Sequence, residues 1–323
     1  MSASDQPANP GRARTTSRLR WIVGFSILGL ILALGAVIFL EADSTSSGWA
    51  PGTIFVANDN NTLTVIRPDR SIRTTIKLSG APFGLAIAPP GTPNAGTVYV
   101  SNPNGLDVIE PGSAKITSHV ALPCTPKVKV RGPSSEGICG AGGLSADLVV
   151  APAGAPNAGT VYVGGNWTSF GAATIGHTEG KVWAYVPGKS TVSTITFPDP
   201  LMTLAIAPQG ASNVGTVYSA TETQALSSIT ATTQVVQTHA LSQADGTYTF
   251  LGVAPTGTPS VGDVYLWRNR YPTEVVQILH GGSTANVKST TIPAQVNTAE
   301  VAPLGAPNAG VTYLAAESTY SQQ

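Results

Sequence analysis

Short apolar runs separated by turn residues make up most of the chain from about residue 52 onward. Runs such as Leu63–Ile66 and Thr97–Val100 are four residues long, rich in β-branched or aromatic residues, and flanked by Gly, Pro or Asn. In Ile72–Leu78 apolar and polar residues alternate, as they do in an outer strand with one face in water. Length and flanking residues favour strands over buried helices. The pattern therefore predicts an all-β domain.

One stretch of this pattern is repeated. Ala88–Val100 reads APPGTPNAGTVYV and Ala151–Val163 reads APAGAPNAGTVYV, and looser copies begin at Ala207, Ala254 and Ala302. Each copy places a Pro/Gly/Asn cluster between two strand-like runs, which is typical of a hairpin in which Asn can bond its own backbone. A second pair of runs follows each hairpin. Four short antiparallel strands in a unit of about 50 residues indicate a propeller blade.

The number of strand-like runs decides between blade counts. We count 21 runs, whereas five four-stranded blades need 20 and six need 24. We expect five blades, with Asn297–Val301 supplying the innermost strand of the blade whose outer strands come from residues 53–78. Val311–Ala315 is then redundant with Ile54–Ala57. When strands from both ends of the chain share one blade, the ring of blades is closed and no sheet edge is left exposed. Six blades are the alternative.

The first unit resembles a known repeat. Its runs are Ile54–Asn58 (IFVAN), Leu63–Ile66 (LTVI), Thr75–Leu78 (TIKL), Pro82–Pro89 (PFGLAIAP) and Val98–Asn102 (VYVSN). They are similar to the YVTN-type β-propeller repeat family, whose strands read YVAN, VSVID, TIPVG and P-GVAVSPDG. The resemblance covers about residues 52–316 and is closer in the first unit than in later ones. The longer Gly-x-Pro-Asn-Ala-Gly turn replaces the Asp-Gly turn of the family. The resemblance implies the fold and assigns no activity.

The N-terminal part differs in composition from the rest. Residues 1–20 are polar, with four arginines and one acid, and read as a disordered cytoplasmic arm. Residues 21–40 carry no charge, and 20 helical residues span about 30 Å, the thickness of the bilayer core. Arginines before this run and Glu41 and Asp43 after it place the N-terminus in the cytoplasm and the C-terminal domain outside. We therefore expect a single transmembrane helix that acts as a signal anchor in the cell membrane.

A cleaved signal peptide is the alternative to the anchor. Its apolar core would normally span about 7–15 residues, and Phe39-Leu40-Glu41 is a poor cleavage site. Residues 41–51 then form a linker and residues 52–323 an extracytoplasmic propeller. The short anchor and the Ala/Gly/Pro-rich composition favour a bacterial source. With 13 basic and 16 acidic residues after residue 40, the ectodomain is a poor match for nucleic acid.

Two long insertions mark one face of the propeller. Pro123–Gly143 and Gly164–Gly180 flank the same blade, on the face opposite the repeated turns. Loops on a rigid scaffold commonly carry binding sites, so this face is the candidate site. The expected contact residues are aromatic, titratable or basic: Trp167, Phe170, His177, Glu179, Lys127, Lys129, Arg131, Arg268, Arg270 and Tyr271. The alternatives are packing between the insertions for the aromatic residues and an ordinary solvated surface for the others.

The two cysteines, Cys124 and Cys139, lie in the first insertion. Outside the membrane they would form a disulfide, which stabilises a short loop by about 3 kcal/mol in the chain-entropy model. No zinc, phosphate-binding or nucleophile-elbow motif is present. We therefore expect no catalytic residues, metal or cofactor. Asn166–Thr168 is a formal glycosylation sequon.

These observations favour a membrane-anchored binding module for an envelope protein or a cell-surface ligand. The alternative is an extracytoplasmic propeller lactonase or lyase, with histidines and acids in a central pocket. The expected inner strands, such as Leu85–Ile87 and Leu204–Ile206, are apolar, and only Glu300 would bring a carboxylate there. A purely structural surface protein is the third possibility.

Overall fold

The computed structural model describes twelve stretches of the chain. They are residues 37–39, 48–123, 138–140, 147–171, 174–197, 199–221, 225–240, 247–270, 273–283, 287–292, 295–301 and 311–317. In these residues the regular structure consists of strands and one 3-10 turn, η1 (His280–Gly282), without an α-helix. The all-β prediction is confirmed for this part of the chain.

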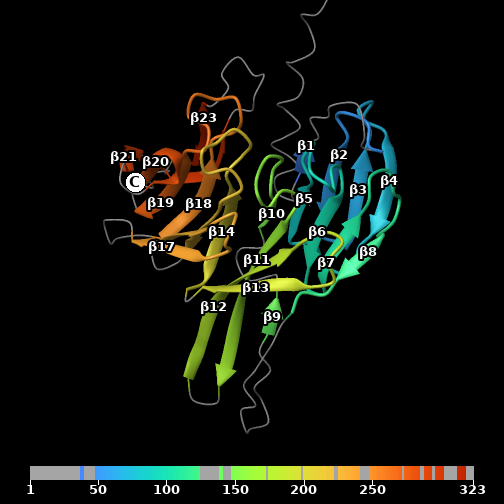
Figure 1. The fold of residues 1–323 in the computed structure, drawn as a ribbon, viewed down its shortest axis with the longest axis horizontal. Coiled ribbons are helices and arrows are strands. Elements are labelled where there is room, and N and C mark those ends of the chain that lie inside the picture. Colours follow the sequence, from blue (N-terminus) through green and yellow to red (C-terminus); the bar gives the residue numbers. More distant parts are fainter. Residues whose placement is uncertain are drawn as a thin grey trace, which may run out of the picture.

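The strands form six antiparallel sheets (Figure 1). The first comprises β1 (Val37–Phe39), β2 (Ile54–Asn58), β3 (Thr62–Ile66) and β4 (Ile72–Lys77), and the second β5 (Gly84–Ile87), β6 (Val98–Asn102), β7 (Gly105–Ile109) and β8 (Ser118–Val120). The third comprises β10 (Leu148–Val150), β11 (Val161–Gly171), β12 (Thr174–Tyr185) and β13 (Val192–Phe197), with β9 (Ile138–Gly140) added to β11. The fourth comprises β14 (Leu201–Ile206), β15 (Val217–Thr221), β16 (Ala225–Ile229) and β17 (Val236–Ala240). The fifth comprises β18 (Thr247–Val253), β19 (Val264–Arg270), β20 (Thr273–Leu279) and β21 (Val287–Ile292), and the sixth β22 (Gln295–Val301) and β23 (Thr312–Glu317).

Within each sheet the strands pair in chain order, apart from β9, so five sheets have the four-stranded order expected of a blade. The first strands of successive sheets, β1, β5, β10, β14, β18 and β22, contact one another in that order. They therefore line the inside of the arrangement.

The composition of the first sheet differs from the prediction. The expected innermost strand, Asn297–Val301, belongs to β22 and pairs with β23, while β1 takes the innermost position beside β2. The pairing of β22 with β23 is a local hairpin across one repeated turn. A short connection costs less loop entropy than pairing across the whole chain, which favours the observed arrangement.

Three residues of the predicted membrane span, Val37–Phe39, form β1 and pair with Ile54–Val56. The sequence predicted helix at these positions. None of the helices in the described residues has the length and apolar character needed to cross a membrane. Residues 1–36 and 40–47 lie outside the described residues, so the cytoplasmic arm and the anchor stay predictions.

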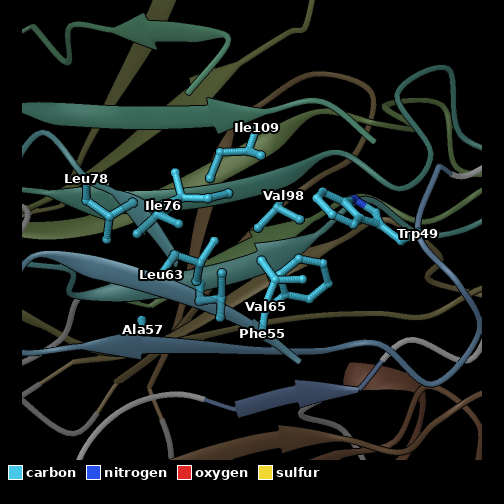
Figure 2. Close-up of a cluster of buried hydrophobic side chains, with 11 residues drawn as sticks. Trp49, Phe55, Ala57, Leu63, Val65, Ile76, Leu78, Val98 and Ile109 are labelled. Atoms are coloured by element: carbon cyan, nitrogen blue, oxygen red, sulfur yellow. The ribbon is translucent and has the colours of Figure 1, made fainter. Parts of the chain in front are cut away.

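The core lies between the faces of neighbouring sheets. Figure 2 shows the cluster between the first and second sheets, where Phe55, Leu63 and Ile76 meet Val98 and Ile109. Similar clusters fill the spaces between the following sheets. The core is thus divided into layers of aliphatic and aromatic side chains, as alternation within each strand predicts.

The repeated turn has one geometry in four copies. In the first, the Ala88 N–H donates to Thr97 O at 2.9 Å and the Gly96 N–H donates to Ala88 O at 2.9 Å. The equivalent bonds recur in the copies that start at Ala151, Ala207 and Ala254. The conserved pattern of hydrogen bonds closes the hairpin between the first and second strands of each sheet, which confirms the predicted hairpins.

The asparagine of this turn joins one sheet to the next. Asn157 Nδ2 donates to Tyr162 Oη at 2.8 Å and to Gly215 O, in the next turn, at 2.9 Å. Asn94 and Asn213 make the same pair of bonds in their own copies. The sequence pointed to a bond within the turn's own backbone, whereas the side chain bridges two sheets. Burial raises the pKa of the tyrosines that receive these bonds, Tyr99, Tyr162 and Tyr218.

Removing one bridge should cost measurable stability. Asn213→Ala loses the bonds to Tyr218 Oη and Gly262 O, so we expect the free energy of unfolding to fall by about 1–3 kcal/mol. The fourth turn offers a matched control, because Ser260 stands at the asparagine position and lies 3.4 Å from Tyr265 Oη. Ser260→Ala should change stability by less than about 0.5 kcal/mol. Urea unfolding of the full chain measures both, and equal effects would contradict the bridging role.

A sixth copy of the turn lies where the sequence indicated a linker. Gly52 and Thr53 match Gly96 and Thr97: both glycines have positive φ, and the Thr53 N–H donates to Ala50 O as the Thr97 N–H does to Asn94 O. Ala50 therefore stands at the asparagine position. The preceding Trp49 is 2% exposed and donates its indole N–H to Gly96 O at 3.0 Å, so it makes the bridge that Ala50 cannot. The packed domain thus includes residues 48–51.

Candidate functional site

A long hairpin continues two strands of the third sheet beyond the end of their neighbours. β10 pairs with Val161–Val163 and β13 with Gly180–Tyr185, whereas β11 and β12 remain paired with each other as far as Gly171 and Thr174. In Figure 1 the ends of these two strands project away from the other sheets. The repeated turns lie at the opposite ends of the strands, so the hairpin is on the face that the sequence indicated.

The two predicted insertions meet in this hairpin. β9, from the first insertion, pairs with Asn166–Thr168 of β11, so that Cys139 lies opposite Trp167. The second insertion, Gly164–Gly180, was expected to be a loop. Backbone pairing nevertheless continues through it, with an irregular register beyond Ser169. The site is therefore a three-stranded extension of a blade.

The base of the hairpin is fixed to the fourth sheet. Asn166 Nδ2 donates to Leu201 O at 3.0 Å, and the Leu201 N–H donates to Asn166 Oδ1 at 2.7 Å. Asp147 Oδ2 accepts from the Leu204 N–H at 2.8 Å and from Thr203 Oγ1. These bonds hold two sheets together directly below the projecting strands. Both polar atoms of the Asn166 side chain, the asparagine of the sequon, therefore form hydrogen bonds within the fold.

The predicted contact residues are placed by the structure as follows. Trp167, Phe170 and His177 lie in β11 and β12, with Trp167 opposite Glu179 and Ser169 opposite His177 in the register. Glu179 has a described side chain, and its Oε2 lies 2.8 Å from Lys181 Nζ, which also donates to Thr196 Oγ1. The structure thus brings together four of the predicted residues in one hairpin.

Two further predicted residues lie on another sheet, and the others lie outside the described residues. Arg268 and Arg270 lie in β19 of the fifth sheet, which the fourth sheet separates from the third. Lys127, Lys129, Arg131, Tyr271 and Cys124 lie outside the described residues. The predicted basic cluster and the predicted disulfide therefore stay predictions.

A polar network on the same face was missed at the level of sequence. Asp107, fully buried in β7, accepts bonds from the Ser79 N–H at 2.8 Å, Ser79 Oγ at 2.7 Å and Asn102 Nδ2 at 3.0 Å. His119 Nδ1 lies 2.8 Å from Asp107 Oδ1, and its Nε2 lies 3.0 Å from Asn104 O. His119 was not among the contact residues expected from the sequence. The one signal in the sequence was an aspartate in the otherwise apolar run Leu106–Ile109.

This network is not a hydrolytic triad, although it contains serine, histidine and aspartate. The Ser79 hydroxyl donates directly to Asp107, and it approaches the same histidine nitrogen, Nδ1, that faces the carboxylate. A triad needs the serine and the carboxylate on different ring nitrogens. The network instead joins the loop after the first sheet to the outer strands of the second. The role of the network is therefore to stabilise the contact between these two sheets.

The inner strands offer little for acid–base catalysis. Their described side chains are apolar except for Thr203, whose hydroxyl donates to Asp147, and Ile87, Val149, Ile206 and Val253 pack against the core clusters. In the part of the chain that the structure describes, no group of three or more His, Cys, Asp or Glu residues is arranged to hold a metal ion. Glu300 lies in β22, and its side chain is not described.

Solved structures with related architecture identify the fold. An ancestral GH74 enzyme superposes with a TM-score of 0.56 at 16% identity, over 88% of this chain and 35% of that one. BBS1N, solved in complex with ARL6DN, superposes with a TM-score of 0.53 at 13% identity, over 88% of this chain and 75% of that one. Combined with the radial order of four-stranded sheets, these likenesses decide the fold. The chain is a β-propeller.

No family model matches this propeller, and no curated protein sequence matches it. The chain spans about a third of the length of the GH74 enzyme. At these identities the comparisons establish the architecture, and the activity of neither protein transfers to this propeller.

Proposed function

We propose that this propeller is a membrane-anchored extracytoplasmic interaction module that binds an envelope protein through the β9–β11–β12 extension. The observation that carries the proposal is the projecting hairpin with its base fixed to the next sheet. A projecting element on a rigid base presents its residues without a large ordering cost on binding. The scaffold therefore suits recognition.

The contact residues proposed for this module are those of the extension. Trp167 and Phe170 supply the aromatic side chains that are enriched at protein interfaces, and His177 and Glu179 supply polar ones. The Lys181–Glu179 ion pair at the base balances one charge of the hairpin. We propose that the aromatic residues make the central contact with the partner and that the polar residues surround this contact.

The anchor belongs to the same proposal. It is supported by the uncharged residues that precede β1, from residue 21 onward, and by the arginines before them. An anchor of this kind restricts the module to the membrane surface and raises its effective concentration toward a membrane-associated partner. The binding partner is therefore proposed to be an envelope protein.

A lactonase or lyase is the competing function. Such an enzyme would need acids or histidines that converge on the inner strands, and the inner-strand side chains that the structure describes include no acid and no histidine. The geometry therefore favours binding over catalysis.

Shortening the hairpin tests the proposal. Trp167 and Glu179 lie directly opposite each other, so residues 168–178 can be replaced by Asn-Gly, which closes two antiparallel strands. We expect the shortened full-length protein to lose at least tenfold in recovery of solubilised envelope proteins, while its melting temperature falls by only a few degrees. Lys189→Glu, in the turn between β12 and β13 at the other end of these strands, is the control and should bind normally. Normal binding by a folded, shortened protein would refute the choice of site.

A further inference from the structure

One tight corner of the second sheet combines an asparagine with a following glycine. Pro103 and Asn104 join β6 to β7, and β7 begins with Gly105, which lies opposite Asn102. This is the only Asn-Gly pair in the sequence, and Asn104 is exposed. Asparagine is among the residues that degrade thermally. An asparagine followed by glycine is the most labile case, because the backbone nitrogen of the glycine can attack the asparagine side chain.

Packing requires the glycine at this corner. Gly105 has a φ of +142°, and a Cβ atom there would lie 2.3 Å from Val120 O and 3.0 Å from His119 Nε2. Any other residue would collide with β8, so the fold fixes the Asn-Gly pair. Because glycine has no side chain, nothing on that residue hinders an approach of its backbone nitrogen to the asparagine.

His119 contacts the peptide group that joins these two residues. Its Nε2 lies 3.0 Å from Asn104 O, the carbonyl oxygen of the peptide bond whose nitrogen belongs to Gly105. A carbonyl oxygen only accepts hydrogen bonds, so this contact requires a proton on Nε2. Asp107 Oδ1 lies 2.8 Å from Nδ1 and holds the ring in this orientation. When the Gly105 nitrogen loses its proton, negative charge spreads onto Asn104 O, where the histidine N–H stabilises it.

We propose that Asn104 is a site of deamidation that the fold itself promotes. The Gly105 nitrogen loses its proton to solvent and bonds to Asn104 Cγ, while the Cγ–Nδ2 bond breaks and Nδ2 takes up one proton and leaves as ammonia. Water then adds to one of the two carbonyl carbons of the resulting succinimide and breaks the bond of that carbon to the Gly105 nitrogen, which gives aspartate or isoaspartate. Water is the only co-reactant. The modification does not depend on the function proposed for the β9–β11–β12 extension.

The product changes the junction between the first two sheets. Asn104 Nδ2 donates to Ser79 O at 2.6 Å, and the Ser79 N–H donates in turn to the buried Asp107. A carboxylate at position 104 cannot donate to Ser79 O, and it adds a negative charge beside a network that already holds the Asp107 carboxylate. Deamidation is therefore a slow, irreversible change that loosens the contact between the first and second sheets.

Peptide mapping of the full-length protein by mass spectrometry measures the reaction. Folded wild-type protein kept at neutral pH should accumulate aspartate and isoaspartate at position 104. In His119→Asn the amide can still donate to Asp107 but is too short to reach Asn104 O. We expect this variant to deamidate at least about tenfold more slowly, because removal of one oxyanion donor from an enzyme costs about 100- to 1000-fold. His119→Gln, whose amide is long enough to reach Asn104 O, is the matched variant and should recover most of the rate.

Two further measurements cover the case in which His119→Asn does not fold. In wild-type protein unfolded by urea, His119 no longer contacts Asn104 O, so deamidation should be slower than in the folded chain. Asn104→Asp carries the aspartyl product and should melt a few degrees below the wild type, whereas an unchanged melting temperature would refute the loosening of the junction. An intact Asn104 in folded wild-type protein would overturn the proposal. So would an undiminished rate in folded His119→Asn, or a faster reaction in urea.

Discussion

Replacing Trp49 by alanine is expected to lower the free energy of unfolding by about 3–5 kcal/mol, the usual cost of removing a large buried aromatic side chain. The Trp49 ring packs edge-on against Phe55, with centroids 5.1 Å apart and planes at 84°. The Arg73 guanidinium lies 4.9 Å from the centroid of the Trp49 ring, and the indole N–H donates to Gly96 O. The substitution therefore removes aromatic packing, a cation–π contact and the bridge between the first two sheets.

Trp49→Phe separates these contributions. Phenylalanine keeps a ring in the cluster and loses the bond to Gly96 O, so we expect a loss of about 1–3 kcal/mol. Thermal and urea unfolding of the full chain provide the measurement. Wild-type stability in Trp49→Ala would show that residues 48–51 act as a linker, as the sequence had indicated.

Gly215→Ala is expected to destabilise the propeller by about 3 kcal/mol. Gly215 has a φ of +78°, and a Cβ atom there would lie 2.3 Å from Asn157 Oδ1 and 2.6 Å from Ala155 Cβ. The left-handed backbone alone costs alanine about 1–2 kcal/mol. Displacement of the asparagine that bridges two sheets adds the cost of overpacking and of the lost bonds to Gly215 O and Tyr162 Oη.

Gly210→Ala is the matched control for this prediction. Gly210 has a φ of +86° in the same turn, and nothing lies within 4 Å of the Cβ position. Its substitution should therefore cost only the backbone term of about 1–2 kcal/mol. Differential scanning calorimetry of both variants shows whether the Gly215 effect exceeds the Gly210 effect. Equal melting temperatures would mean that close packing against Asn157 contributes nothing.

The face on which the second insertion lies agrees with the prediction, whereas its conformation does not. Gly164–Gly180 was expected to be a loop, because its own sequence does not show that a distant segment would pair with it. Pairing with β9, a segment from the other insertion, and continuous pairing of β11 with β12 made it a sheet extension. The Asp107–His119 network was missed for a related reason. Asp107 and His119 lie opposite each other on β7 and β8, and Ser79 reaches them only when the first and second sheets join.

The sequence by itself determined the strands, their grouping into blades and the hairpin turns, because period-two alternation and Gly/Pro/Asn turns are local properties of the chain. Tertiary structure decided which strands share a sheet at the two ends of the chain. It also decided that Asn94, Asn157 and Asn213 bond to the next sheet, and that Trp49 takes this role where Ala50 cannot. These outcomes depend on contacts between residues about 35 to 65 positions apart, which only the packing of complete sheets against one another brings together.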